Sequence, residues 1–167
     1  MRTVLVGGGS RSGKSRYALE LARARGSRLA FLATAQAFDQ EMADRIALHR
    51  EERASEFATI EEPSDIARAI AAHAGFDAIV VDCLTLWVTN LILAEIDVEV
   101  EPVIEAARAN PATIVFVTNE VGCGIVPENA LARRFRDLAG RVNQQVAAAA
   151  DEVYYMAFGI PIKVKPS

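Results

Sequence analysis

The sequence predicts an α/β fold in which a mainly parallel sheet is flanked by helices. Runs of consecutive apolar residues, such as Leu29–Ala33 and Ala78–Val81, indicate strands buried on both faces, because a half-exposed strand would alternate apolar and polar residues. Helical patterns separate these runs, as expected for parallel strands joined by crossover helices. A glycine-rich segment follows the first apolar run directly.

Each element in the first half of the chain has a local signal. Gly26 stops a first helix, Asp39 can N-cap a second, and Pro63 favours the start of a third. The predicted elements are, in order, a strand at Thr3–Val6, a helix at Lys14–Arg25, a strand at Leu29–Ala33, a helix after Asp39, a strand at Phe57–Ile60 and a helix from Pro63 to near Gly75.

The second half repeats the alternation and ends in two short strands. We expect a strand at Ala78–Val81, a helix at Pro102–Ala109, a strand at Thr113–Val117, a helix from Asn129 or Ala130 to Ala150, and strands at Val153–Met156 and Ile162–Val164 around a turn at Gly159–Pro161. Neither a linker nor a repeat interrupts the pattern, so we expect one catalytic domain over residues 1–167.

Composition excludes several classes of function. Of 167 residues, 51% are hydrophobic and 24% charged, which is typical of a globular protein. The net charge of −4 gives no basic face for nucleic acid. The two cysteines, Cys83 and Cys123, form no zinc-type pair. The most membrane-like stretch, Ala78–Ala94, contains polar residues and falls short of the roughly 20 apolar residues that span a membrane, so we expect a cytoplasmic protein without membrane insertion.

The glycine-rich segment carries the strongest chemical signal. It matches the P-loop pattern G-x-x-x-x-G-K-[ST] at Gly8, Gly9, Ser10, Arg11, Ser12, Gly13, Lys14 and Ser15. The glycines let backbone N–H groups converge on phosphate oxygens, and the following helix adds its N-terminal dipole. Lys14 is one of only three lysines and is placed to bind the β- and γ-phosphates. The sequence therefore predicts a nucleoside triphosphate site.

A carboxylate at the end of a neighbouring strand would complete that site. Asp82 directly follows the apolar run Ala78–Val81. Its carboxylate and the Ser15 hydroxyl are the residue types that hold Mg²⁺ beside a P-loop. We therefore predict Ser15 and Asp82 as metal ligands. The alternative for Asp82 is an ordinary aspartate in a turn.

His49, one of only two histidines, lies among arginines. On a helix, Arg45, His49 and Arg53 would share one face. Two guanidinium groups would keep the imidazole neutral and free to attack phosphorus. The spacing alone fits a solvated helix face at least as well, and both interpretations stay open on this evidence.

Four blocks of this sequence together resemble the bifunctional adenosylcobinamide kinase/adenosylcobinamide-phosphate guanylyltransferase family. They are Gly7–Ser15, the segment from Ala33 to Arg53, Asp82–Leu91 and Val117–Asn129, and the last continues into Arg136–Val153. The blocks occur in the family's order and cover nearly the whole chain. Phe57 stands where the family often has tryptophan.

The resemblance implies a RecA-like P-loop fold, a homotrimer and two reactions. The family phosphorylates adenosylcobinamide with ATP or GTP, and then transfers GMP from GTP to adenosylcobinamide phosphate through a GMP–histidine intermediate. Carried onto this chain, the nucleophile is His49 and Lys14 is catalytic. The implied nucleotide contacts also include Ala33, Thr34, Ala35, Arg50, Glu51, Glu52, Arg53, Glu61 and Asp82.

Two other functions compete with this interpretation. One is a P-loop kinase for a small molecule that makes no covalent use of His49. The other is a RecA-like module that binds a polymer or a protein partner. The acidic composition disfavours binding to a polymer. Covalent use of His49 distinguishes the bifunctional enzyme from the kinase.

Overall fold

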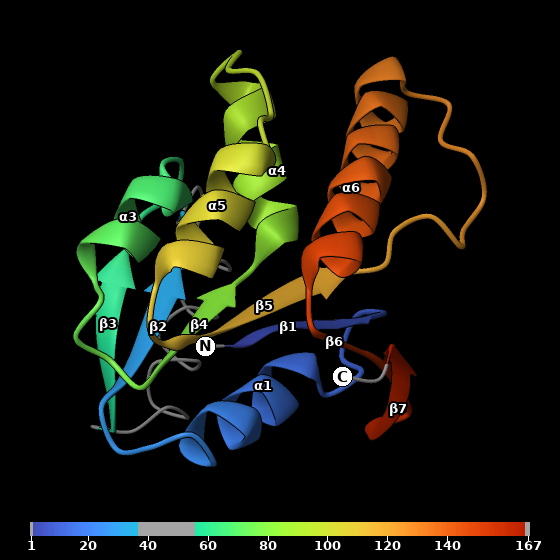
Figure 1. The fold of residues 1–167 in the computed structure, drawn as a ribbon. Coiled ribbons are helices and arrows are strands. Elements are labelled where there is room, and N and C mark those ends of the chain that lie inside the picture. Colours follow the sequence, from blue (N-terminus) through green and yellow to red (C-terminus); the bar gives the residue numbers. More distant parts are fainter. Residues whose placement is uncertain (1, 37–55, 166–167) are drawn as a thin grey trace.

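The computed structural model describes residues 2–36 and 56–165. Within these residues seven strands form one sheet in the order β3-β2-β4-β5-β1-β6-β7 (Figure 1). The strands are β1 (Arg2–Gly8), β2 (Leu29–Ala33), β3 (Phe57–Glu61), β4 (Ala78–Asp82), β5 (Thr113–Asn119), β6 (Glu152–Ala157) and β7 (Ile160–Lys165). All neighbours pair in parallel except β6 and β7. The predicted fold class is confirmed.

Helices cover both faces of this sheet. Helix α1 (Lys14–Arg23) packs on one face, and the other described helices pack on the opposite face (Figure 1). These are α3 (Ile66–Ala72), α4 (Leu84–Leu93), α5 (Glu101–Ala109) and α6 (Ala130–Ala149). Successive residues of one strand serve the two layers: Val80 packs toward α1, while Ile79 and Val81 pack toward the other helices. This double burial explains the continuous apolar runs of the sequence.

Helix α3 begins later and ends earlier than predicted. Pro63 lies outside it, and Asp65 is the N-cap, with its side chain accepting a hydrogen bond from the Arg68 N–H at 3.0 Å. The Glu62 carboxylate holds the preceding turn by accepting from the N–H groups of Ser64 and Asp65. An aspartate that accepts from the helix N-terminus outweighs the preference of proline for a first turn.

Helix α4 has no counterpart among the predicted helices. Leu84, Trp87, Val88 and Leu91 are buried in it, and the polar Asn90 is buried as well. A helix enclosed on nearly all sides has no polar stripe, so the amphipathic period that marks the other helices is missing.

The last turn also differs from its prediction. Phe158 and Gly159 form it, with φ angles of 54° and 81°, while Ile160 and Pro161 belong to β7. Two central residues with positive φ are typical of a type I′ hairpin turn. Pro161 is tolerated because β7 is an edge strand. The helix predicted after Asp39 lies outside the described residues.

A buried carboxylate joins three strands at the hairpin. Glu152 on β6 is only 4% exposed. It accepts from Arg2 Nε at 2.8 Å, from Lys163 Nζ at 2.7 Å and from the Tyr154 hydroxyl at 2.6 Å, and Arg25 lies 3.7 Å away. The hydrogen bonds from Lys163 and Tyr154, with the nearby Arg2, lower the pKa of Glu152. The ionised carboxylate therefore stabilises the fold.

We expect Glu152→Gln to lower the free energy of unfolding by about 2 kcal/mol at pH 7, the range for a hydrogen-bonded charged group. Because the folded-state pKa lies below the ordinary 4.5, the stabilisation is complete above pH 4.5 and is lost as the pH falls through the folded-state value. Urea unfolding of both proteins between pH 7 and pH 3 measures this. A deficit that stays constant over that range would contradict the assignment, and Glu128→Gln, on an exposed loop, is the control.

Candidate functional site

The P-loop is shaped by glycines at each end. A β-carbon at Gly8 would lie 2.8 Å from the Met156 carbonyl oxygen and 2.8 Å from Ser12 Oγ, so a side chain does not fit there. Gly13 has a φ of 92° and is the N-cap of α1, a left-handed conformation that glycine adopts without strain. Ser10 and Arg11 are exposed at the crest of the loop. The chain can therefore reverse between β1 and α1 with its N–H groups able to face a ligand.

The Lys14 side chain extends back across the P-loop. Its ammonium donates to the Gly9 carbonyl oxygen at 2.6 Å, and the residue is 7% exposed. Burial lowers the pKa of Lys14, and the charge of Asp82 opposes that shift. Ser12 Oγ is also buried and has no hydrogen-bond partner among the described residues. A buried hydroxyl without a partner, beside a buried cation, fits a loop that receives phosphate oxygens.

Asp82 ends β4 at the same edge of the sheet as the P-loop. Strand β5 lies between β4 and β1, so one strand separates the carboxylate from Gly8. The Asp82–Cys83 peptide bond is cis. Within 2–36 and 56–165, His, Cys, Asp and Glu residues form no group of three or more that could hold a metal ion. The two predicted metal ligands, Ser15 in the first turn of α1 and Asp82 at the end of β4, both belong to this edge of the sheet.

The Thr34 side chain forms its hydrogen bonds inside the protein. It is fully buried, its hydroxyl donates to the Cys83 carbonyl oxygen at 2.9 Å, and it accepts from the Cys83 N–H at 2.8 Å. Asn90 Nδ2 donates to the Thr34 carbonyl oxygen at 2.7 Å. Thr34 thus positions the tips of β2 and β4, and its neighbours Ala33 and Ala35 are half-buried there.

Glu61 lies at the same sheet edge but far from the P-loop. It ends β3, and strands β2, β4 and β5 lie between β3 and β1. The residue is exposed. His49, Arg50, Glu51, Glu52 and Arg53 lie outside the described residues. The predicted site residues that the structure describes are therefore spread along one edge of the sheet.

Two segments that the sequence reasoning gave no role also contact the P-loop. The Glu120 N–H donates to the Gly8 carbonyl oxygen at 3.0 Å, and the Gly159 N–H donates to the Ser12 carbonyl oxygen at 3.1 Å. Glu120 follows β5 in a polar block, and Gly159 belongs to a recognisable turn. The sequence shows both the polar block and the turn, but their proximity to the P-loop depends on the order of the strands in the sheet.

Hydroxyl and amide groups connect the tip of β5 to α4 and α6. Thr118 Oγ1 donates to Asn143 Oδ1 at 2.7 Å and lies 3.3 Å from Thr85 Oγ1. Since the Thr118 proton is used toward Asn143, Thr85 is the donor of that second bond. Thr85 Oγ1 in turn accepts from the Asn119 N–H at 2.7 Å. This network fixes the strand tip between Asp82 and the P-loop.

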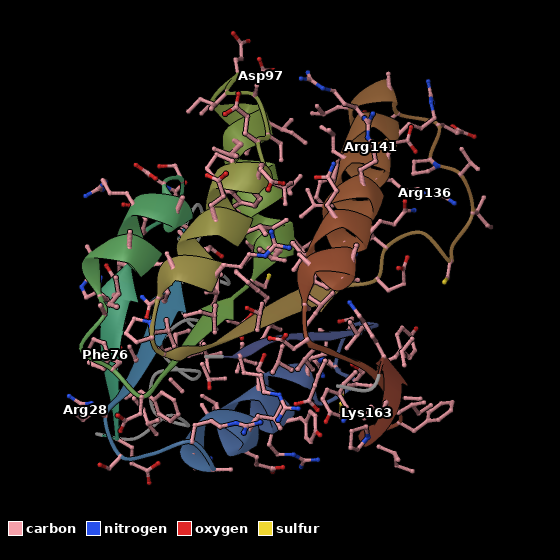
Figure 2. The ribbon with its side chains drawn as sticks, in the orientation of Figure 1. Arg28, Phe76, Asp97, Arg136, Arg141 and Lys163 are labelled. Atoms are coloured by element: carbon pink, nitrogen blue, oxygen red, sulfur yellow. The ribbon has the colours of Figure 1, made fainter. Side chains whose placement is uncertain are left out.

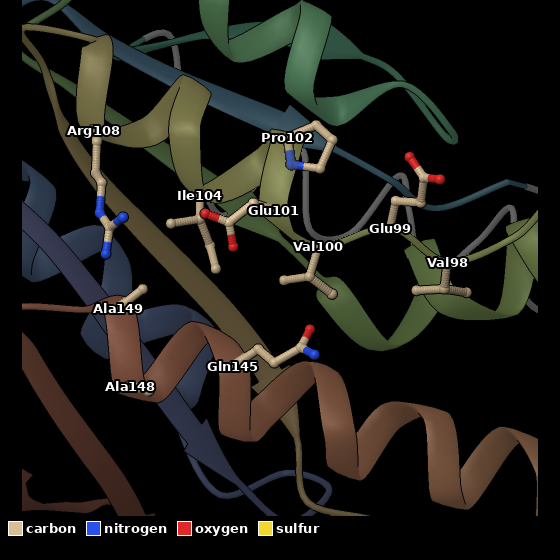
Figure 3. A pocket seen from close by; sticks show the side chains of 10 residues that line it. All are labelled: Val98, Glu99, Val100, Glu101, Pro102, Ile104, Arg108, Gln145, Ala148 and Ala149. Carbon is tan, nitrogen blue, oxygen red and sulfur yellow. The ribbon is translucent and has the colours of Figure 1, made fainter.

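The described cavity lies elsewhere. A pocket of about 640 Å³ opens between α5 and α6, where Glu101, Arg108 and Gln145 contribute polar groups (Figure 3). None of the predicted site residues lines it. Charged side chains are distributed over the surface seen in Figure 2, so surface charge does not mark out the P-loop. Its distinguishing features are its backbone geometry and the buried Lys14 ammonium. None of the described helices has the length and apolar character to cross a membrane.

Comparison with known proteins agrees with this geometry. The family model for cobinamide kinase/cobinamide phosphate guanyltransferase matches residues 4–164. The bifunctional adenosylcobalamin biosynthesis protein CobU of Salmonella typhimurium is 45% identical over 180 residues, covering 97% of this chain and 99% of that protein. CobP of Pseudomonas aeruginosa is 42% identical over 166 residues, with 96% of each chain covered.

Solved structures resemble the chain in fold alone. The flagellar accessory protein FlaH of Methanocaldococcus jannaschii is 12% identical with a TM-score of 0.60, over 99% of this chain and 79% of that one. A prototypical ATPase from the type III secretion system of pathogenic bacteria is 15% identical with a TM-score of 0.57, over 97% and 56%. The fold shared with these structures confirms the predicted RecA-like fold class. The P-loop, the sheet topology and the match over nearly the whole chain together show that this protein belongs to the cobinamide kinase/cobinamide phosphate guanylyltransferase family of bifunctional enzymes.

Proposed function

We propose that the P-loop edge of the sheet performs both reactions of the family, acting on adenosylcobinamide and then on adenosylcobinamide phosphate. The observation that carries this is the loop itself, where a backbone turn excludes side chains. A buried ammonium lies in this loop, as does a buried hydroxyl that has no hydrogen-bond partner within residues 2–36 and 56–165. One such cradle can hold the β- and γ-phosphates of ATP or GTP in either reaction.

In the kinase reaction the acceptor is the hydroxyl of the aminopropanol arm. Its oxygen forms a bond to the γ-phosphorus while the bond from that phosphorus to the β,γ-bridging oxygen breaks. The nucleoside diphosphate leaves, and the hydroxyl proton passes to solvent. Lys14 and the loop N–H groups stabilise the charge that develops on the phosphate oxygens. Ser15 and Asp82 would hold Mg²⁺, which would supply further positive charge to the triphosphate.

In the guanylyl reaction His49 acts as the nucleophile. A ring nitrogen attacks the α-phosphorus of GTP, pyrophosphate leaves, and GMP remains bound to the imidazole. A phosphate oxygen of adenosylcobinamide phosphate then attacks the same phosphorus and releases the histidine. Arg50, Glu51, Glu52, Arg53, Glu61 and the Ala33–Ala35 segment are the remaining proposed nucleotide contacts. Thr34 supports them through its backbone position rather than its buried side chain.

The proposal extends to domain organisation and assembly. Residues 1–167 form one catalytic domain of a cytoplasmic enzyme that does not act on nucleic acid. Three copies assemble, which the exposed apolar side chains of Ile160, Ile162 and Val164 on edge strand β7 support.

Light scattering should give about three times the chain mass, and a monomer at micromolar concentration would contradict the trimer.

His49→Ala should abolish covalent labelling by GTP that carries a label on the α-phosphate, because in the proposed mechanism the His49 ring nitrogen carries the GMP. Label on the wild type should be acid-labile and base-stable, and a γ-label should leave none. His73→Ala is the matched control, since His73 caps α3 through the Ala69 carbonyl oxygen at 2.7 Å. Unlabelled but folded wild type would favour the kinase without a covalent step.

Lys14→Ala should lower the rate of both reactions by roughly 100-fold or more, the effect of removing one positioned charge donor. Steady-state assays of cobinamide phosphorylation and of GMP transfer measure the two rates separately. Lys165→Ala, which removes only contacts to carbonyl oxygens at the end of α6, is the control. Selective loss of one reaction would mean that the two nucleotides use separate sites.

A further inference from the structure

The turn between β6 and β7 forms one surface with the P-loop. Besides the hydrogen bond from the Gly159 N–H to the Ser12 carbonyl oxygen, a β-carbon at Gly13 would lie 3.4 Å from Gly159 Cα. Arg16, in the first turn of α1, brings Nη2 within 3.8 Å of a β-carbon placed at Gly159. A ligand that leaves the loop on this side would meet Arg16 and the turn together.

Phe158 stands at the tip of this turn in an unfavourable conformation. Its side chain is 99% exposed and its φ is 54°. The first central position of a type I′ turn favours Asn, Asp or Gly, and a bulky residue with positive φ is an outlier. An aromatic ring is therefore held in solvent, against the local backbone preference, beside the phosphate loop. Such outliers cluster where a ligand is held.

Strand order sets the direction in which a nucleotide would lie. Asp82 is on one side of β1, across β5, and the Phe158–Gly159 turn is on the other side, beyond β6. A phosphoryl donor whose α-phosphate and nucleoside point away from Asp82 extends from the P-loop toward this turn. That direction leads past Arg16 to Phe158.

We propose that Phe158 is the stacking platform for the purine base of the kinase donor, with the Arg16 guanidinium beside the α-phosphate; this inference rests on the proposed function. A phenyl ring offers a face and no hydrogen-bonding groups, so it does not distinguish adenine from guanine. ATP and GTP then bind alike as phosphoryl donors. Glu61 lies on the other side of the P-loop, so the GTP that donates GMP places its guanine away from Phe158.

The test compares Phe158→Asn with Phe158→Tyr. Asparagine suits the turn but removes the ring, so its melting temperature should equal or exceed that of the wild type. We expect its KM for ATP and for GTP in the kinase reaction to rise about 10-fold, within the range for loss of one stacked base, with kcat unchanged. Phe158→Tyr keeps the ring and should stay within about twofold of wild type.

Binding is measured independently of catalysis with a fluorescent ADP analogue. Its dissociation constant should rise in Phe158→Asn by the same factor as the KM. Leu93→Asn, a substitution at an exposed apolar residue at the end of α4, away from the P-loop and the hairpin, should change neither quantity. Covalent labelling by α-labelled GTP should remain unchanged in Phe158→Asn.

Three results would overturn this inference. They are an unchanged KM and dissociation constant in Phe158→Asn, a loss confined to one of the two nucleotides, or a change in association state that accounts for the loss. An inactive wild-type kinase would instead contradict the proposed function, and the binding titration would then decide the role of Phe158 alone.

Discussion

The close approach of β1 to β6 at Gly8 is the constraint on which the site depends. No side chain fits between Gly8 and the Met156 carbonyl oxygen, so the chain must leave β1 directly into the loop. Gly13 then admits the left-handed conformation that starts α1 at Lys14. The loop is held from both flanks, by Glu120 at Gly8 and by Gly159 at Ser12. The phosphate cradle is therefore built from backbone contacts that depend on neighbouring strands.

The family reactions fit an edge along which charged groups are spread out. Lys14 and Ser12 face the loop, Asp82 stands across one strand, and Glu61 ends the outermost strand on that side. The Thr85–Thr118–Asn143 network keeps the intervening β5 tip in place. In phosphoryl transfer the acceptor attacks the γ-phosphorus, whereas in nucleotidyl transfer the nucleophile attacks the α-phosphorus. A site that extends along the sheet edge on both sides of the P-loop suits an enzyme that performs both reactions.

Much of this arrangement could be predicted from sequence because the signals are local. The P-loop, strand β2 and the start of α6 at Ala130 each follow from a few adjacent residues. Helix α4 could not be found this way because it is buried on nearly all sides and shows no period. The packing of Gly159 against Ser12 was also beyond reach, since it results from the position of β6 beside β1. The local residue pattern identified the P-loop, whereas the segments that contact the loop depend on the order of the strands in the sheet.

The contact between Ser12 and Gly159 joins segments from opposite ends of the chain, and this has a consequence for folding. Among the described strands, β1 pairs only with β5 and β6, both of which follow it by more than half of the sequence. Contacts of such large sequence separation form slowly. The P-loop therefore takes its final shape only after β5 and β6, which are synthesised much later, have paired with β1. Nucleotide affinity in this enzyme accordingly depends on the pairing of β1 with both β5 and β6.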